Sequence, residues 1–406
     1  MKTALTVEQL PYSAALLITI LLPFDFFLGP SILLLFIAIL IAQPFKQTVQ
    51  NLQNNKLFIL FSGSYLIYVA AMIWTENQSF GKRDLEYKLS ILFLPILIAA
   101  LTRLNRSAFE LLIKAFIASF IIAAIVSFFV SYANNSFQHI PTYIELSIFM
   151  HPTYFSVYLN LAFIFLIKYI GFQSKSSKQQ LLIFCLSAFL IAFNLLLNSK
   201  IGIILNLLLI LIFIIQGLHR FSKKSALLFI SLFVIALALI FTQVDAVKSR
   251  FQSIGSTLSA ENIPKDSDES SRLRILIWHQ VFEILEDQPL LGVGTGDTKD
   301  ELVKSYKKNG ITYAYKNRLN AHNQYLEWLL TFGIIGTLFW LICFIVPILL
   351  SIKHANVLYP WFCFIVLVVF LVESFLEREY GVIFFAFFNS LLFFHAPIED
   401  EKIITE

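Results

Sequence analysis

Apolar runs of bilayer length recur along almost the entire chain, and they constrain the fold more than any other feature. A helix needs about 20 apolar residues to cross the hydrocarbon core of a membrane. Such runs lie at 12–28, 30–45, 57–74, 89–102, 108–132, 153–170, 180–198, 201–218, 225–243, 322–350, 358–375 and 380–396. Hydrophobic residues make up 58% of the 406 and charged residues only 14%, so polar groups could not cover a soluble surface. The sequence therefore predicts an all-α integral membrane protein with about 12 transmembrane helices.

The basic residues of the short loops predict how the chain is oriented in the membrane. With the N-terminus placed inside, eleven Lys and Arg residues fall in short inner loops and five in short outer loops. Because Lys and Arg accumulate on the cytoplasmic side, both termini are expected in the cytoplasm. The first apolar run lacks a following small-residue cleavage site, so we expect a retained helix and not a signal peptide. The basic residues thus report topology, and no nucleic-acid partner is expected.

The one long polar stretch, 244–321, is predicted to be an outward-facing, periplasmic loop that contains short helices. It divides the chain into helices one to nine (1–243), the loop (244–321) and helices ten to twelve with a cytoplasmic tail (322–406). Within the loop, 272–286 predicts an amphipathic helix capped by Ser270 or Ser271. A second helix is expected at 298–308, with Asp297 as its N-cap and Gly310 at its end.

Several cations on the predicted outer side could bind an anion. Arg274 lies one helical turn before Trp278, and its planar guanidinium suits phosphate oxygens. Arg272 would point about 200° away from Arg274 around the same helix, so the two cannot face one ligand. Lys200 stands between two apolar runs and could meet a phosphate or simply extend its amine to the membrane surface. Arg318 belongs to a basic second half of the loop, for which a solvated face is the simpler interpretation.

Two histidines and a glutamate complete the set of candidates. His322 opens the run 322–350, and Asn320 is the expected N-cap, which would leave His322 in the first helical turn. The positive end of the helix dipole would then keep its imidazole neutral, as a general base requires. The alternative is an interfacial polar residue without a chemical role. His151 and Glu373 are further candidates, and Glu373 could instead pair with Arg378.

The sequence gives no sign of a metal or nucleotide site. No His, Cys or carboxylate residues stand at metal-ligand spacing, and the three cysteines lie in apolar runs where they are expected to pack. Gly292, Gly294 and Gly296 follow no predicted strand, which argues against a dinucleotide fingerprint.

Taken together, these segments resemble the O-antigen ligase and polymerase family. The shared pattern is an Arg four residues before a Trp, then Pro-x-x-Gly-x-Gly, then a His-Asn pair that opens a helix with Gly-x-x-Gly. In this chain the pattern consists of Arg274, Trp278, Pro289, Gly292, Gly294, His322, Asn323, Gly333 and Gly336. The family also places an Arg at the outer end of a mid-chain helix, usually as Ser-Arg-Gly, where this chain has Ser199, Lys200, Ile201 and Gly202.

The resemblance implies a membrane glycosyltransferase of the GT-C type in the bacterial inner membrane. Such an enzyme takes a glycan from undecaprenyl diphosphate at the periplasmic face and needs neither metal nor nucleotide cofactor. The expected function is ligation of the glycan to lipid A core. By motif position, Arg274 and His322 would be catalytic. The residues expected to contact the diphosphate or the glycan are Lys200, Arg272, Arg318, His151 and Asn323.

Other functions stay open at this level. A polymerase would add the glycan to another lipid-linked repeat, and a related enzyme would add it to protein Ser or Thr. His322 could act as a base or could orient the diphosphate. A transporter of lipid-linked sugars would also suit twelve helices, but transporters place polar sites near the midplane and show repeated halves. Here the charged candidates collect at the outer face and no repeat is visible.

Overall fold

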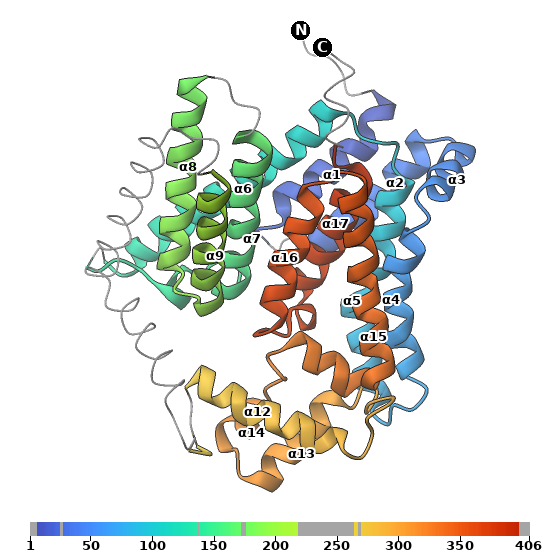
Figure 1. Ribbon diagram of the computed structural model, residues 1–406, viewed down its shortest axis with the longest axis vertical. Coiled ribbons are helices and arrows are strands. Elements are labelled where there is room, and N and C mark those ends of the chain that lie inside the picture. Colours follow the sequence, from blue (N-terminus) through green and yellow to red (C-terminus); the bar gives the residue numbers. More distant parts are fainter. Residues whose placement is uncertain are drawn as a thin grey trace. The chain divides into compact units, whose positions relative to one another are not determined.

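The structure is a computed structural model that describes residues 6–24, 27–136, 138–171, 176–217, 264–266 and 269–397. These residues form helices joined by turns, without a β-strand among them, so the predicted all-α class is confirmed for this part of the chain. The chain divides into two compact units (Figure 1). Unit 1 consists of 1–18, 28–110 and 260–406, and unit 2 of 19–27 and 111–259.

Most of the described helices overlap the predicted apolar runs. Unit 1 contains α2 (Leu28–Ala42), α3 (Phe45–Asn54), α4 (Phe58–Ala71), α5 (Gln78–Ala100), α12 (Ser270–Leu285), α13 (Thr298–Asn309), α14 (Thr312–Asn317), α15 (Gln324–Lys353), α16 (Leu358–Phe370) and α17 (Glu379–His395). Unit 2 contains α7 (Pro152–Ile164), α8 (Ser177–Leu196) and α9 (Lys200–Gly217). Two more helices, α1 (Leu10–Leu21) and α6 (Arg106–Asn134), belong in part to each unit. The predicted run 225–243 lies outside the described residues.

Several of these helices have the length and composition to cross a membrane. In the described part of the chain four do so alone: α6, α7 with the π-helical turn that continues it to Ile170, α8 and α15. A fifth span results if α2 and α3, which meet at 116°, are counted together, and further apolar helices are shorter. The total of twelve spans stays a prediction.

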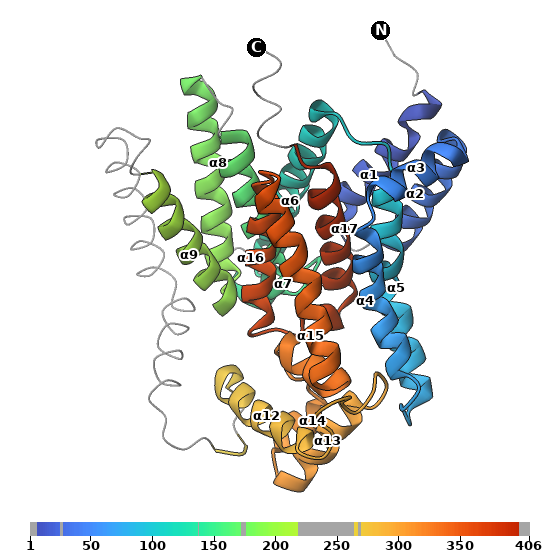
Figure 2. The same ribbon diagram turned by 45° about the vertical axis from the view of Figure 1, so that its right-hand side comes forward.

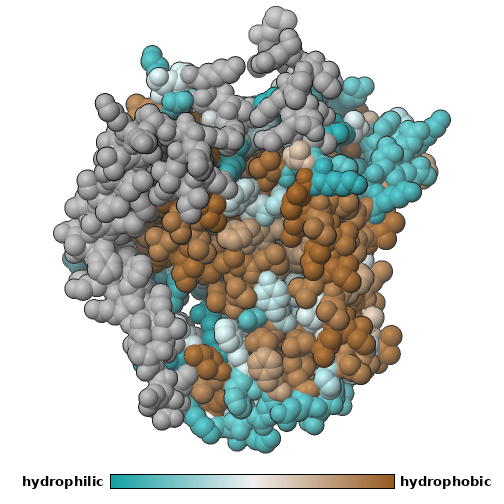
Figure 3. All heavy atoms as spheres, viewed as in Figure 1, coloured by the Kyte–Doolittle hydropathy of each residue, from teal (hydrophilic) through white to brown (hydrophobic). Residues whose placement is uncertain are grey.

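In unit 1 the helices are packed through aromatic side chains. The helix α17 lies against α5, α5 against α4, and α4 against α15 (Figure 1). Trp328 and Trp340 of α15 stack with ring centroids 4.5 Å apart, and Tyr68 of α4 meets Phe332 edge to face at 4.7 Å. On its other side α15 leaves seven large apolar residues exposed, at Ile334, Ile335, Leu338, Ile342, Ile345, Leu349 and Ile352. Figure 3 shows apolar atoms gathered over this helical part, as a lipid-facing surface requires.

The helices α12, α13 and α14 form a polar cap at one end of α15 (Figure 2). The cap has its own small core, in which Ile277 and Val281 of α12 pack with Leu302 and Tyr306 of α13. Hydrophilic residues gather at its outer end (Figure 3). An apolar interior and a hydrophilic surface are what a domain in water needs, so the cap is suited to the aqueous side of a membrane.

Three local predictions need correction. The cap of α12 is Glu269, whose carboxylate accepts from the N–H groups of Ser271 and Arg272; a carboxylate is stabilised at this positive end of a helix. The cap of α15 is Asn323 and not Asn320, so His322 precedes the helix instead of lying in its first turn. The helix α5 begins at Gln78, well before the predicted 89, and so includes Lys88, which directly precedes the predicted run. By contrast, Asp297 and Gly310 flank α13 as predicted.

The glycine motif 289–294 serves to hold a break in α15. At Gly333 the helix backbone has φ 62° and ψ −163°, a conformation open essentially to glycine alone. The backbone groups freed by this break are bound by the motif loop. The N–H groups of Val293 and Gly294 donate to the carbonyls of Leu330 and Thr331 at 2.8 and 3.0 Å. In return the N–H of Ile334 donates to the carbonyl of Pro289 at 2.9 Å.

We predict that Gly333→Ala destabilises the protein by about 1–3 kcal/mol, because the new side chain is strained at this backbone conformation. Its Cβ would also lie 2.3 Å from the carbonyl carbon and oxygen of Leu290, and neither backbone atom can move away easily. Thermal unfolding in detergent checks this. The matched control is Gly63→Ala in α4, where the added Cβ has no neighbour within 4 Å. Equal melting temperatures for the two variants would show that the break does not depend on glycine.

Candidate active site

The candidate site in unit 1 is built around one carboxylate, that of Glu373, which lies between the two residues predicted to be catalytic. Its Oε2 is 3.8 Å from Nη2 of Arg274 and 3.6 Å from Nδ1 of His322. Both distances allow ion pairing but are longer than a hydrogen bond. The side chain of Arg274 is 22% exposed, that of His322 is 27% exposed and that of Glu373 is 12% exposed. The site is therefore sheltered but open to a ligand.

Arg274 is placed by the amphipathic pattern of α12. Leu273, Ile277 and Val281 form the buried stripe of this helix, and Arg274 stands beside that stripe. One turn later, the indole N–H of Trp278 donates to the carbonyl of Ala321 at 2.9 Å. This bond joins α12 to the residue that directly precedes His322. The predicted spacing of Arg and Trp thus connects the two segments that carry Arg274 and His322.

His322 has an unusual backbone conformation, with φ +47°. Left-handed φ is uncommon for a residue other than glycine and is maintained only when surrounding contacts fix it. The Oδ1 of Asn320 accepts from the N–H of His322 at 3.2 Å, and the helix starts two residues later. His322 therefore lies in a tight turn at the end of α15, aimed at Glu373 by its backbone.

A buried glutamate of α15 fixes this turn. Oε2 of Glu327 accepts from the N–H of Ala321 at 3.0 Å and from the hydroxyl of Ser374 at 3.1 Å. Ser374 directly follows Glu373, and its Oγ accepts in turn from the N–H of Asn323 at 3.2 Å. The turn that carries His322 and the segment that carries Glu373 are therefore bound to the same side chain.

The remaining candidates of unit 1 have other surroundings. The Oδ1 of Asn323 accepts from the N–H of Leu326 and its Nδ2 donates to the carbonyl of Leu371, so its amide serves the backbone. Arg318 forms an ion pair with Asp300 at 2.8 Å, on the exposed side of the cap. Arg272 is the third residue of α12, and its N–H donates to Glu269.

Glu373 pairs with Arg274 and His322, whereas the sequence analysis had considered a pairing with Arg378. That pairing was inferred from sequence proximity alone. Glu327 was missed altogether, although an ionisable residue within an apolar run is a signal in itself. Spacing along the sequence could not place the segment from Leu371 to Glu377 next to α15.

 Glu327 and its partner Ser374 are 47 residues apart in the sequence. Only the packing of α15 against α16 closes that separation.

Lys200 and His151 belong to unit 2. Lys200 is the first residue of α9, and His151 is the N-cap of α7, where its Nδ1 accepts from the N–H of Thr153 at 3.3 Å. The start of α9 is held by a buried polar network. Asn206 Nδ2 donates to Oδ1 of Asn160 at 3.0 Å, and the hydroxyl of Ser156 bonds to Asn194.

Gly202 explains how α9 can lie this close to α7. A Cβ at this position would be 1.6 Å from Oγ of Ser156. Small residues allow apolar helices to approach closely, and the amides between them are then satisfied within the interface. The Ser199 to Gly202 segment is thus a packing motif as well as the carrier of Lys200.

We predict that Gly202→Ala lowers the melting temperature in detergent, because the new methyl group overlaps a buried hydroxyl; overpacking typically costs about 1–3 kcal/mol. The double variant Gly202→Ala with Ser156→Gly removes the overlapping side chain and should recover part of the loss. If the double variant is no more stable than Gly202→Ala, contact with Ser156 is not the cause.

Comparisons with known proteins place these features in a family. Residues 185–341 match the family model described as O-antigen ligase, and this range includes Lys200, Arg274 and His322. The chain is also 23% identical over 362 residues to the ComP-specific O-oligosaccharyltransferase of Acinetobacter baylyi (strain ATCC 33305 / BD413 / ADP1). That similarity covers 83% of this chain and 62% of the relative, so the chain spans less than two thirds of that protein's length. The resemblance predicted from the sequence motifs is therefore confirmed, in that residues 185–341 match the O-antigen ligase family model.

Proposed function

We propose that this chain is a membrane glycosyltransferase that moves a glycan from undecaprenyl diphosphate to lipid A core at the periplasmic face of the bacterial inner membrane. The observation that supports this most is the convergence of Arg274 and His322 on Glu373. Both residues belong to the motif segments of a family of glycan ligases. The polar cap beside them is suited to the aqueous side, where a glycan must be handled.

The reaction exchanges one bond at the anomeric carbon for another. The acceptor oxygen forms a bond to that carbon, and the bond from the carbon to the diphosphate oxygen breaks. Negative charge develops on the departing diphosphate, and a fixed cation stabilises it in the transition state. Arg274 is the proposed cation, since its fork of N–H donors fits phosphate oxygens.

His322 is the proposed general base. Its imidazole takes the proton from the acceptor hydroxyl as the new bond forms. Glu373 faces Nδ1 of the same ring at 3.6 Å, so that the other ring nitrogen is left for the acceptor. The carboxylate also balances the charge of Arg274 before the diphosphate arrives. Glu373 is thus a positioning residue that serves both partners.

Lys200 is proposed as a second phosphate-binding cation on the strength of the motif alone. Lysine keeps the charge of the family's arginine but binds as a point charge, without the bidentate geometry. Lys200→Arg should therefore preserve function better than Lys200→Ala.

A protein acceptor is the second candidate, because the relative found by comparison is named as an O-oligosaccharyltransferase. The hydroxyl of a Ser or Thr side chain would meet the same base and the same donor. The two functions differ in the acceptor and not in the proposed chemistry.

We expect Arg274→Ala and His322→Ala to reduce glycan transfer at least 100-fold, the scale of losing a transition-state donor or a general base. The measurement is complementation of a deletion strain, with glycan on the acceptor compared with glycan left on the lipid carrier. Immunoblots of membranes give the protein level. Arg318→Ala is the control, because that arginine pairs with Asp300 on the exposed side of the cap. Normal transfer by both alanine variants would rule out the proposed mechanism.

The acceptor is identified by deleting the gene in its host and analysing glycolipid, lipid-linked glycan and glycoprotein together. We expect full-length lipid-linked glycan to accumulate while lipid A core stays bare. Core that carries single repeats would indicate a polymerase instead. Loss of glycan from proteins with unchanged glycolipid would establish the protein acceptor, and no change in any of the three would contradict glycan transfer.

A further inference from the structure

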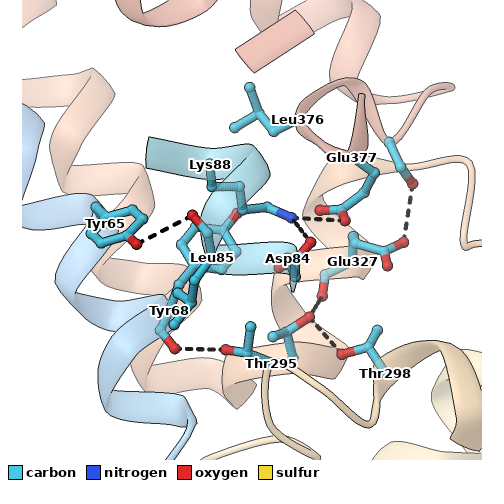
Figure 4. Close-up of polar contacts among 12 residues, drawn as sticks. Tyr65, Tyr68, Asp84, Leu85, Lys88, Thr295, Thr298, Glu327, Leu376 and Glu377 are labelled. Carbon is cyan, nitrogen blue, oxygen red and sulfur yellow. Dashed lines mark hydrogen bonds and ion pairs between the residues drawn. The ribbon is translucent and has the colours of Figure 1, made fainter. Parts of the chain in front are cut away.

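Lys88 of α5 is a buried cation within the helical part of unit 1. Its side chain is 1% exposed, and its amine forms ion pairs with Asp84, one turn earlier, and with Oε2 of Glu377 at 2.9 Å (Figure 4). The ring of Tyr68 lies against the same amine, with 5.0 Å from Nζ to the centroid. Removing an ammonium group from water costs several kcal/mol, so such a residue calls for a reason beyond stability.

The partner Glu377 ends the segment that carries Glu373. This segment, 371–377, connects α16 to α17 and is held by contacts along its length. The carbonyl of Leu371 accepts from Asn323, and the N–H of Leu376 donates to Oε1 of Gln324 at 2.7 Å. Ser374 bonds to Glu327. Those three contacts all come from α15 and its N-cap.

The ion pair with Lys88 is of a different kind, because it joins the segment to α5. Phe375 also packs against Phe370 of α16 and Phe384 of α17, and the ion pair adds a charged contact with α5 four residues after Glu373. A displacement of about 1 Å in a catalytic group can cost a factor of about 100 in rate. Charge-assisted bonds are short and strong, which suits them to prevent such a displacement.

We propose that Lys88 is a positioning residue, which acts through Glu377 to hold Glu373 between Arg274 and His322. This inference rests on the proposed function, since it assigns Lys88 to the same site. The family match covers 185–341 and therefore includes neither Lys88 nor Glu377.

The cleanest test breaks the tie at Glu377, because Glu377→Ala leaves Lys88 paired with Asp84. In the complementation assay we expect transfer to fall about 10-fold, within the range of a modest displacement, at an unchanged level of protein in membranes. Glu283→Ala is the matched control: it breaks the pair with Lys308, also 2.9 Å long, on the surface of the cap. That variant should transfer glycan at the normal rate.

A double-mutant cycle separates positioning from a general loss of stability. If Lys88 acts through Glu373, Glu377→Ala should reduce transfer less than 2-fold further in a Glu373→Gln background, because the group being positioned is already lost. A merely structural role would lower transfer by the same factor in both backgrounds. Lys88→Arg keeps the charge and should retain more activity than Glu377→Ala. Should Glu377→Ala not accumulate, Glu377→Gln takes its place in the cycle, since it removes only the charge.

The outcomes distinguish this inference from the proposed function. Suppose that Arg274→Ala and His322→Ala are inactive, as the proposed function requires. Normal transfer by Glu377→Ala, or an equal loss in both backgrounds, would then overturn the role of Lys88 alone. Normal transfer by those two alanine variants would overturn the proposed function itself.

Discussion

One buried carboxylate, that of Glu327, holds together the parts on which the candidate site depends. It is placed within α15 and accepts hydrogen bonds from the turn before that helix and from the segment after α16. A carboxylate out of water is tolerated only when hydrogen bonds satisfy it. The hydrogen bonds that Glu327 needs in order to be buried therefore also fix where His322 and Glu373 lie. In a similar way, the buried ion pair between Lys88 and Glu377 joins α5 to the end of the segment that carries Glu373.

Backbone chemistry accounts for the glycines of the motif. The break at Gly333 frees carbonyl and N–H groups in an apolar surrounding, where unpaired backbone groups are unfavourable. The loop 289–294 binds them, and a Cβ at Gly292 would lie 2.4 Å from the carbonyl oxygen of Leu330. The glycines thus allow two backbones to approach each other. These backbone hydrogen bonds connect the loop after α12 with α15. They are a second connection, besides the Trp278 hydrogen bond, between the helix of Arg274 and the helix that follows His322.

In unit 2, buried polar side chains are also satisfied by hydrogen bonds, but these side chains are uncharged. Ser156, Asn160, Asn194 and Asn206 are each at most 3% exposed and bond to one another or to nearby carbonyls. Gly202 has no Cβ, which leaves space for the side chains of Ser156 and Asn194. This network determines where α9 begins, and Lys200 is its first residue. The position of a cation in the motif is thereby tied to helix packing.

The sequence by itself determined the helical class and the position of most described helices, because apolar length is a local property, and motif spacing singled out Arg274 and His322 as candidates. It failed at helix starts, where Glu269 and Asn323 were preferred to nearby polar residues of similar capping ability. Only the tertiary structure decided that Glu373 lies between Arg274 and His322 and that Lys88 is buried against Glu377. Those contacts join residues 51 to 289 positions apart, and no local pattern specifies which helices pack together. The physical reason is that a buried charge selects its partner by proximity in space, after the helices have packed.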